Sequence, residues 1–254
     1  EAGQRPALVL LHGIGGSSDS WEYQLSHFSA DYRVISWDMP GYGESGNLES
    51  ATPAVDDYVS ALAGLLEALG ETRVHMLGQS IAALIAARFT ARYPDRTESF
   101  IFAHGLTGLN GLPAVARDKA KAGRLEVFDA MGPVRFAHEK GPAIMSPGVS
   151  DEAREKAVGI MARVRPDGFR QAVEMLASSD FFDDAPHIAA PSLVLCGADD
   201  PVSPEPVCRS VAGALPNAAF HLLDGVGHYS ALENPGLFNR ALETFLCSLP
   251  DGSI

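Results

Sequence analysis

The chain has 254 residues, of which 46% are hydrophobic and 20% charged, a composition typical of a folded globular protein. Lysine and arginine number 19 against 32 aspartates and glutamates, which gives a net charge of −13. A nucleic-acid-binding protein would need a basic face, so we do not expect that class. No run of about 18 apolar residues is present, so we expect neither a spanning helix nor a membrane partner.

Short apolar runs alternate with helical patterns along the chain. The predicted strands are Ala7–Leu11, Arg33–Trp37, Val74–Leu77, Ser99–Ala103, Ser192–Cys196 and Ala219–Leu223. The predicted helices are Val55–Leu69, Ser80–Tyr93, Glu205–Ala214 and Pro235–Leu246. Most of the strand runs are unbroken rather than alternating, as expected for strands covered on both faces. The sequence therefore predicts an α/β fold, a mostly parallel sheet with helices on both faces.

One long interval breaks this alternation. Residues 109–184 show no convincing strand, only helical patterns interrupted by Gly132-Pro133, Gly141-Pro142 and Ser146-Pro147-Gly148. We interpret this interval as a helical insertion that follows the strand Ser99–Ala103. The core domain would then comprise residues 1–108 and 185–254.

The cysteines and histidines carry little signal. Cys196, Cys208 and Cys247 form an odd set without C-x-x-C spacing, so they predict neither a disulfide framework nor a zinc site. This usage favours a reducing, cytoplasmic compartment. The eight histidines show no H-E-x-x-H or other paired spacing. We therefore predict no metal and no cofactor.

The strongest chemical signal is Gly78-Gln79-Ser80-Ile81-Ala82, which directly follows a predicted strand and opens a predicted helix. A serine on such a tight turn is forced outward, and small residues two positions before and after it permit the crowding. The helix N-terminus supplies a free N–H where negative charge would develop. Alone, the pentapeptide is equally compatible with a serine that only caps the helix.

Further loops follow the other predicted strands, at the edge where open parallel sheets bind ligands. They are His12-Gly13-Ile14-Gly15-Gly16, Asp38-Met39-Pro40-Gly41-Tyr42-Gly43-Glu44-Ser45, Gly197-Ala198-Asp199-Asp200-Pro201-Val202-Ser203-Pro204 and Gly225-Val226-Gly227-His228. Gly41 to Gly46 also match G-x-G-x-x-G. A dinucleotide site needs a helix that opens there, and the next predicted helix starts only near Val55, so we reject that interpretation.

With these motifs in this order, the chain resembles the α/β-hydrolase fold superfamily. The stretches Arg165-Pro166-Asp167-Gly168-Phe169 and Ile188-Ala189-Ala190-Pro191 are similar to the 3-oxoadipate enol-lactonase branch, near meta-cleavage-product hydrolases and cofactor-free haloperoxidases. That family usually has two further strands ahead of Ala7–Leu11. The resemblance therefore suggests that the natural chain begins before Glu1.

The resemblance also implies site residues. It assigns Ser80 as nucleophile, Asp200 as acid and His228 as base, with Asp199 a weaker alternative for the acid. The backbone N–H groups of Ile14 and Ile81 are expected to form the oxyanion hole. His12, which could serve as a second base, is expected instead to brace its own loop through a hydrogen bond.

The insertion is expected to form a lid that selects a small-molecule substrate. Its arginines Arg124, Arg135, Arg163 and Arg165 are candidates to bind a substrate carboxylate. Any single one is more simply explained as solvated or paired with the 12 acids nearby. We expect at least one of them to face the substrate, since an otherwise acidic protein would repel an anion.

Three functions remain open from the sequence. The first is hydrolysis of a small carboxylic ester or enol-lactone through an acyl-enzyme on Ser80. The second is C–C bond hydrolysis of a ring-fission product by the same residues. Relatives with that activity often carry Asn before the serine, and Gln79 stands there in this chain. The third is a ligand receptor that keeps the fold with little turnover.

Overall fold

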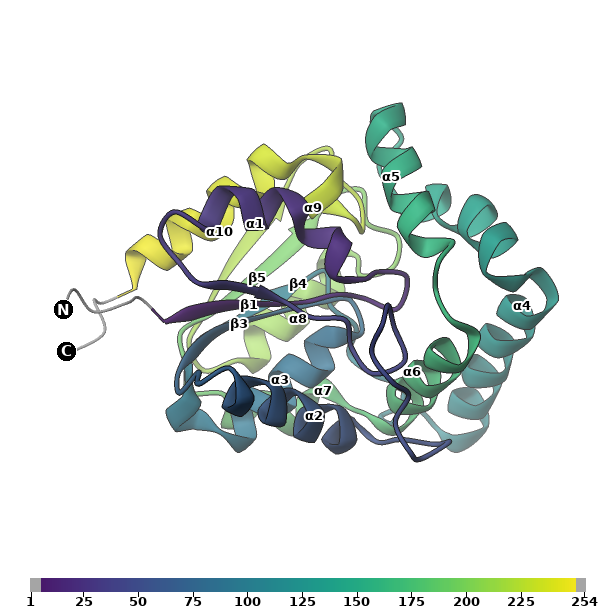
Figure 1. Cartoon of the computed structure of the whole chain (residues 1–254), viewed down its shortest axis with the longest axis horizontal. Helices are drawn as coiled ribbons and strands as arrows, with labels where there is room; N and C mark the ends of the chain where they lie inside the picture. The colour runs from purple at the N-terminus through teal and green to yellow at the C-terminus, as the bar shows by residue number, and fades with distance from the viewer. Residues whose placement is uncertain (1–5, 250–254) are drawn as a thin grey trace.

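The computed structural model describes residues 6–249, and its centre is a parallel sheet (Figure 1). The strands are β1 (Ala7–Leu11), β2 (Val34–Ser36), β3 (Val74–Gln79), β4 (Thr97–Ala103), β5 (Ser192–Gly197) and β6 (Ala218–Leu223). They lie in the order β2-β1-β3-β4-β5-β6, and every neighbouring pair is parallel. The predicted fold class is therefore confirmed, and each predicted strand is found with its ends within two residues.

Helices cover both faces of this sheet (Figure 1). On one face lie α2 (Val55–Ala68), α3 (Ala82–Arg92) and α8 (Glu205–Ala214), and on the other α1 (Glu22–Phe28), α9 (Ser230–Glu233) and α10 (Pro235–Ser248). Short 3-10 turns complete the core at η1 (Ser18–Trp21), η2 (Pro94–Arg96) and η4 (Ala185–His187). Among residues 6–249 no helix combines the length and apolar character needed to cross a bilayer.

The unbroken apolar runs follow from this two-sided cover. In β1 the side chains of Val9 and Leu11 enter the core on one face, while Leu8 and Leu10 enter the core on the other. All four are completely buried. The edge strand β6 instead alternates between half-buried and exposed positions until its last residue. Successive side chains in a strand point to opposite faces, so burial on both sides requires apolar residues at every position.

The segment from Leu109 to Asp184 contains helices and no strand among its described residues; its one β-bridge pairs Asp180 with Gly108. Its elements are α4 (Ala114–Lys140), η3 (Pro142–Ile144), α5 (Asp151–Met161), α6 (Pro166–Ser178) and α7 (Phe181–Asp184). α4 kinks at Gly132, whose φ of 67° is available to glycine at little cost and which precedes Pro133.

Most of this insertion lies to one side of the sheet, beyond the carboxyl ends of the strands (Figure 1). Its last helix, α7, returns to the core, where the ring of Phe181 lies 5.2 Å from that of Phe102 in β4. The insertion is thus anchored at both ends beside the edge where the predicted site residues emerge.

Candidate active site

Ser80 lies on the turn that joins β3 to α3. Its φ of 55° is a left-handed value that is rare for a residue with a side chain. The turn is so tight that a Cβ on Gly78 would lie 2.5 Å from the carbonyl oxygen of Ala82. Ser80 is fastened to the neighbouring strand by its N–H, which donates to the carbonyl of Ala103 at 3.1 Å. The strain therefore fixes the hydroxyl at the carboxyl edge of the sheet.

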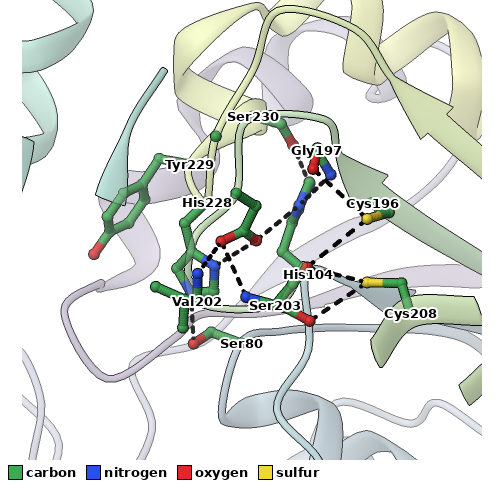
Figure 2. Close-up of polar contacts among 12 residues, drawn as sticks. Ser80, His104, Cys196, Gly197, Val202, Ser203, Cys208, His228, Tyr229 and Ser230 are labelled. Carbon is green, nitrogen blue, oxygen red and sulfur yellow. Dashed lines mark hydrogen bonds and ion pairs between the residues drawn. The ribbon is translucent and has the colours of Figure 1, made fainter. Parts of the chain in front are cut away.

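The structure brings Ser80, His228 and Asp200 together through two hydrogen bonds. Figure 2 shows the side chains of Ser80 and His228 pointing toward each other. Ser80 Oγ lies 2.9 Å from Nε2 of His228, and Nδ1 of the same ring lies 2.8 Å from Oδ2 of Asp200. All three side chains are at most 5% exposed, although 148 residues separate the serine from the histidine. An imidazole held in this way can accept a serine proton while a carboxylate stabilises the resulting cation.

Asp200 is held as a charged acceptor on both of its oxygens. Oδ1 accepts the N–H groups of Val202 and Ser203 at 2.8 and 3.1 Å, which leaves Oδ2 for His228. Burial alone would raise the pKa of this carboxyl, but the two imidazoles beside it, His104 and His228, reverse the effect and the pKa is lowered. Asp199, the alternative acid, points elsewhere and accepts the hydroxyl of Ser146 at 2.7 Å.

The loop that carries His228 is bonded on several sides. Its N–H donates to the carbonyl of Ile144 at 2.8 Å, and its carbonyl accepts from the side chain of Gln79 at 3.0 Å. The carboxylate of Glu233 accepts the N–H groups of Gly227 and Tyr229, the two neighbours of His228, at 2.9 Å each. The imidazole is therefore oriented by backbone bonds as well as by Asp200.

The predicted oxyanion loop lies directly against the serine. A Cβ on Gly13 would approach Cβ of Ser80 to 2.8 Å and its Oγ to 3.4 Å, so only glycine permits this contact. The N–H groups of Ile14 and Ile81 donate no hydrogen bond to any residue in the described range 6–249. Both are therefore available to an external oxygen beside Ser80.

His12 braces this loop, as the sequence predicted. Nδ1 donates to the carbonyl of Gly13 at 2.8 Å, and Nε2 accepts the N–H of Met39 at 3.1 Å. Burial lowers the pKa of His12 to about 4, so the ring is neutral near pH 7. A histidine with both nitrogens engaged has no free position for proton transfer.

The four arginines predicted to bind a substrate carboxylate differ in the partners that they contact. Arg135 pairs with Glu139 and Arg163 with Asp19, all four side chains being exposed. Arg165 donates to the carbonyls of Gly43 and Ser45 and to the side chain of Asn47. Arg124 donates only to the carbonyl of Ala120 and forms no ion pair with any residue the structure describes. Two of the four are therefore paired with acids, Arg165 is held by three neutral acceptors, and Arg124 has a single backbone acceptor among the described residues.

Two residues beside the site, the buried His104 and the half-buried Glu233, were not singled out from the sequence. His104 follows β4, and its Nδ1 lies 3.5 Å from Oδ2 of Asp200. Glu233 lies five residues after His228 and holds its loop. The available signal for His104 was its position at the carboxyl end of a strand; Glu233 gave no signal of its own. Within residues 6–249 no three side chains of His, Cys, Asp or Glu are grouped as a metal would require.

Comparisons with known proteins identify the family and the fold. The model of the Alpha/beta hydrolase family matches residues 8–241. A 2-hydroxy-6-oxononadienedioate/2-hydroxy-6-oxononatrienedioate hydrolase of Burkholderia vietnamiensis is 31% identical over 94% of this chain and 86% of its own. A thermophilic esterase from Thermogutta terrifontis, solved with malate bound, is 25% identical with a TM-score of 0.88, covering 97% of this chain and 91% of its own.

An enol-lactonase from Burkholderia xenovorans shares the fold, with a TM-score of 0.84 at 21% identity over 98% of this chain and 94% of its own. The family match spans most of the chain and includes Ser80, Asp200 and His228. The chain belongs to the alpha/beta hydrolase family, and it is a hydrolase.

Proposed function

We propose that the protein is a serine hydrolase that cleaves a small carboxylic ester or enol-lactone through an acyl-enzyme on Ser80. One observation carries most of the support: Ser80 Oγ, the two nitrogens of His228 and Oδ2 of Asp200 form a line with separations of 2.9 and 2.8 Å. A serine hydroxyl is a weak nucleophile near neutral pH, and an oriented imidazole is the group that activates it.

In the first half-reaction, Nε2 of His228 removes the Ser80 proton as Oγ attacks the carbonyl carbon of the substrate. The free N–H groups of Ile14 and Ile81 stabilise the oxyanion of the tetrahedral intermediate. His228 then gives its proton to the leaving oxygen as the C–O bond breaks. An ester releases its alcohol at this step, whereas an enol-lactone opens to an enol that ketonises and stays attached to the acyl group on Ser80. Asp200 stabilises the transient imidazolium.

In the second half-reaction, His228 removes a proton from water, and the resulting hydroxide attacks the acyl carbon. The second tetrahedral intermediate uses the same two N–H groups. When it collapses, the proton returns to Ser80 Oγ and the carboxylic acid leaves. His228 must be neutral to start each half-reaction, so activity should be lost on the acidic side of the pH profile.

The first test is a burst assay with p-nitrophenyl acetate on the wild type and Ser80→Ala. We expect the wild type to release p-nitrophenol in a burst followed by turnover, and Ser80→Ala to give neither. Ser60→Ala is the matched control, because Ser60 lies on α2 and its hydroxyl donates only to the carbonyl of Asp56. Equal release by wild type and Ser80→Ala would contradict the proposal and favour the receptor alternative.

C–C bond hydrolysis is a second candidate, favoured by the 31% identity to the Burkholderia vietnamiensis hydrolase. The two candidates use the same serine, so the burst assay does not separate them. Values of kcat/KM for an enol-lactone and for a 2-hydroxy-6-oxo-dienoate would do so. We expect the lactone to be preferred, and a preference for the dienoate would replace the first candidate by the second.

We also propose that the substrate carries a carboxylate. An apolar hollow of about 640 Å³ in the insertion is lined by Phe136 and Phe169 and by three cations, Lys119, Arg124 and Lys140. None of the three cations forms an ion pair with another described residue, in a chain of net charge −13. Two of the similar proteins are named for a dioate substrate or were solved with malate, which agrees with an anionic ligand.

A further inference from the structure

His104 is a buried titratable residue that the proposed mechanism does not use. It follows β4, is fully buried, and has a φ of 50°. In the described part of the chain, Ser80 and His104 are the two residues other than glycine that have a positive φ. Strained backbone of this kind persists where surrounding bonds enforce it, and it gathers at functional sites. The strained backbone therefore indicates that His104, like Ser80, is part of the functional site.

The hydrogen bonds of His104 decide where its proton lies (Figure 2). The N–H of Gly197 donates to Nδ1 at 3.1 Å, so Nδ1 is an acceptor and carries no proton. Nε2 therefore bears the proton and donates it to Oγ of Ser230 at 2.5 Å. Nδ1 lies 3.5 Å from Oδ2 of Asp200, a longer separation than its bond to Gly197. A ring in this tautomer gives Asp200 no proton.

The surroundings of His104 favour the neutral ring. Burial is the largest influence and lowers its pKa. The contact with Asp200 and the charges of Asp200 and Glu233 oppose this effect, while the charge of His228 adds to it. Those three are the titratable groups that act on the ring. His104 and His228 lie beside the same carboxylate, with ring centroids 6.3 Å apart.

We propose that His104 is a positioning residue, which keeps Oδ2 of Asp200 for His228 alone and anchors the turn that carries Asp200. This inference rests on the proposed function. The unprotonated Nδ1 is the negative end of the ring dipole, and it faces Oδ2. Oδ2 therefore has no hydrogen-bond donor besides His228 among the described residues, and its negative charge stabilises the imidazolium form of His228. The bond from Gly197 fixes the backbone three residues before Asp200.

The first experiment measures the tautomer in the wild-type protein. Imidazole ¹⁵N chemical shifts of His104, followed by NMR from pH 5 to 9, report which nitrogen carries the proton. We expect the neutral Nε2–H form throughout. A protonated Nδ1 in the range where the enzyme is active would overturn the proposal. Because this measurement needs no turnover, its outcome is independent of whether Ser80 is the nucleophile.

The second experiment compares His104→Leu with His104→Asn. Leucine has no acceptor for the N–H of Gly197, whereas asparagine offers one and tolerates a positive φ. We expect His104→Leu to lower kcat about tenfold or more, the equivalent of one lost hydrogen bond, with KM within about twofold. The acidic limb of its kcat/KM profile should move to lower pH, because the imidazolium of His228 loses the ring dipole. His104→Asn should recover kcat to within about threefold.

Ser230→Ala is the control for a general loosening of the pocket, because it removes only the hydroxyl at Nε2. We expect its acidic limb to stay at the wild-type pH. Equal losses in His104→Leu and His104→Asn, or a His104→Leu profile identical to that of the wild type, would overturn the proposal. If His104→Leu does not fold, the tautomer measurement and the His104→Asn profile still decide the question.

Discussion

Replacement of Asp200 by asparagine tests the line of three side chains most directly. Oδ1 of Asp200 accepts two N–H groups, at 2.8 and 3.1 Å, and only an oxygen can occupy that position. In Asp200→Asn the amide oxygen must stay there, which turns the NH₂ group toward Nδ1 of His228. Nδ1 of His228 must then accept a hydrogen bond, so the proton of the neutral ring lies on Nε2. Nε2 is the nitrogen that faces Ser80, and once protonated it can no longer accept the serine proton.

The expected loss follows from this wrong tautomer. We expect kcat of Asp200→Asn for p-nitrophenyl acetate to fall about 10,000-fold, or about 5.4 kcal/mol, with KM nearly unchanged. Asp199→Asn is the matched control, because Asp199 accepts the hydroxyl of Ser146 and does not contact His228. Its kcat should stay within about threefold of the wild type. A larger loss in Asp199→Asn than in Asp200→Asn would refute the reasoning.

Three further predictions concern packing, pH and substrate charge. Gly227→Ala should lower the free energy of unfolding by about 1–3 kcal/mol in urea titrations, because the added Cβ would lie 2.7 Å from backbone atoms of Met145 and Ser146. Gly213→Ala is the control: its Cβ would enter open space, so this substitution should not destabilise the protein. The pKa of His12 is about 4 in the folded protein and about 6.5 in the unfolded chain, so as pH falls the unfolded chain binds the proton first. The contribution of His12 to the free energy of unfolding should therefore be complete above pH 6.5 and fall by about 3 kcal/mol toward pH 4. His12→Gln should remove this part of the pH dependence in urea titrations. Arg124→Gln should raise KM about tenfold for an anionic ester and leave KM for its neutral analogue unchanged; equal effects on both esters would show that the charge plays no part.

The sequence predicted the sheet well because strands buried on both faces leave an unambiguous pattern. The unbroken run Ala7–Leu11 is found with both ends correct. Helix α1 was missed because it is short and buries only Gln24 and Phe28, two positions on one face. The polar Gln24 is buried because its amide donates to Asn239 on α10, a partner 215 residues away that no local pattern indicates.

The site residues also fall into those that the sequence predicts and those that it does not. Ser80 and His228 follow strands within short motifs, and their meeting depends only on the parallel order of those strands. His104 has no such motif. Its bonds to Gly197 and Ser230 join segments 93 and 126 residues away, so its position beside Asp200 is a property of the folded chain. The arginines could not be ranked from sequence, because their neighbours on other elements decide which charges remain free.

The insertion is part of the machinery that orients His228, as well as a cover beside it. Its backbone at Ile144 accepts the N–H of His228, and the N–H of Ser146 donates at 2.8 Å to the same Glu233 carboxylate that holds both neighbours of the histidine. A carboxylate that collects three N–H groups at 2.8–2.9 Å ties the two segments as one unit. The orientation of the imidazole therefore depends on backbone groups of the insertion as well as on Asp200.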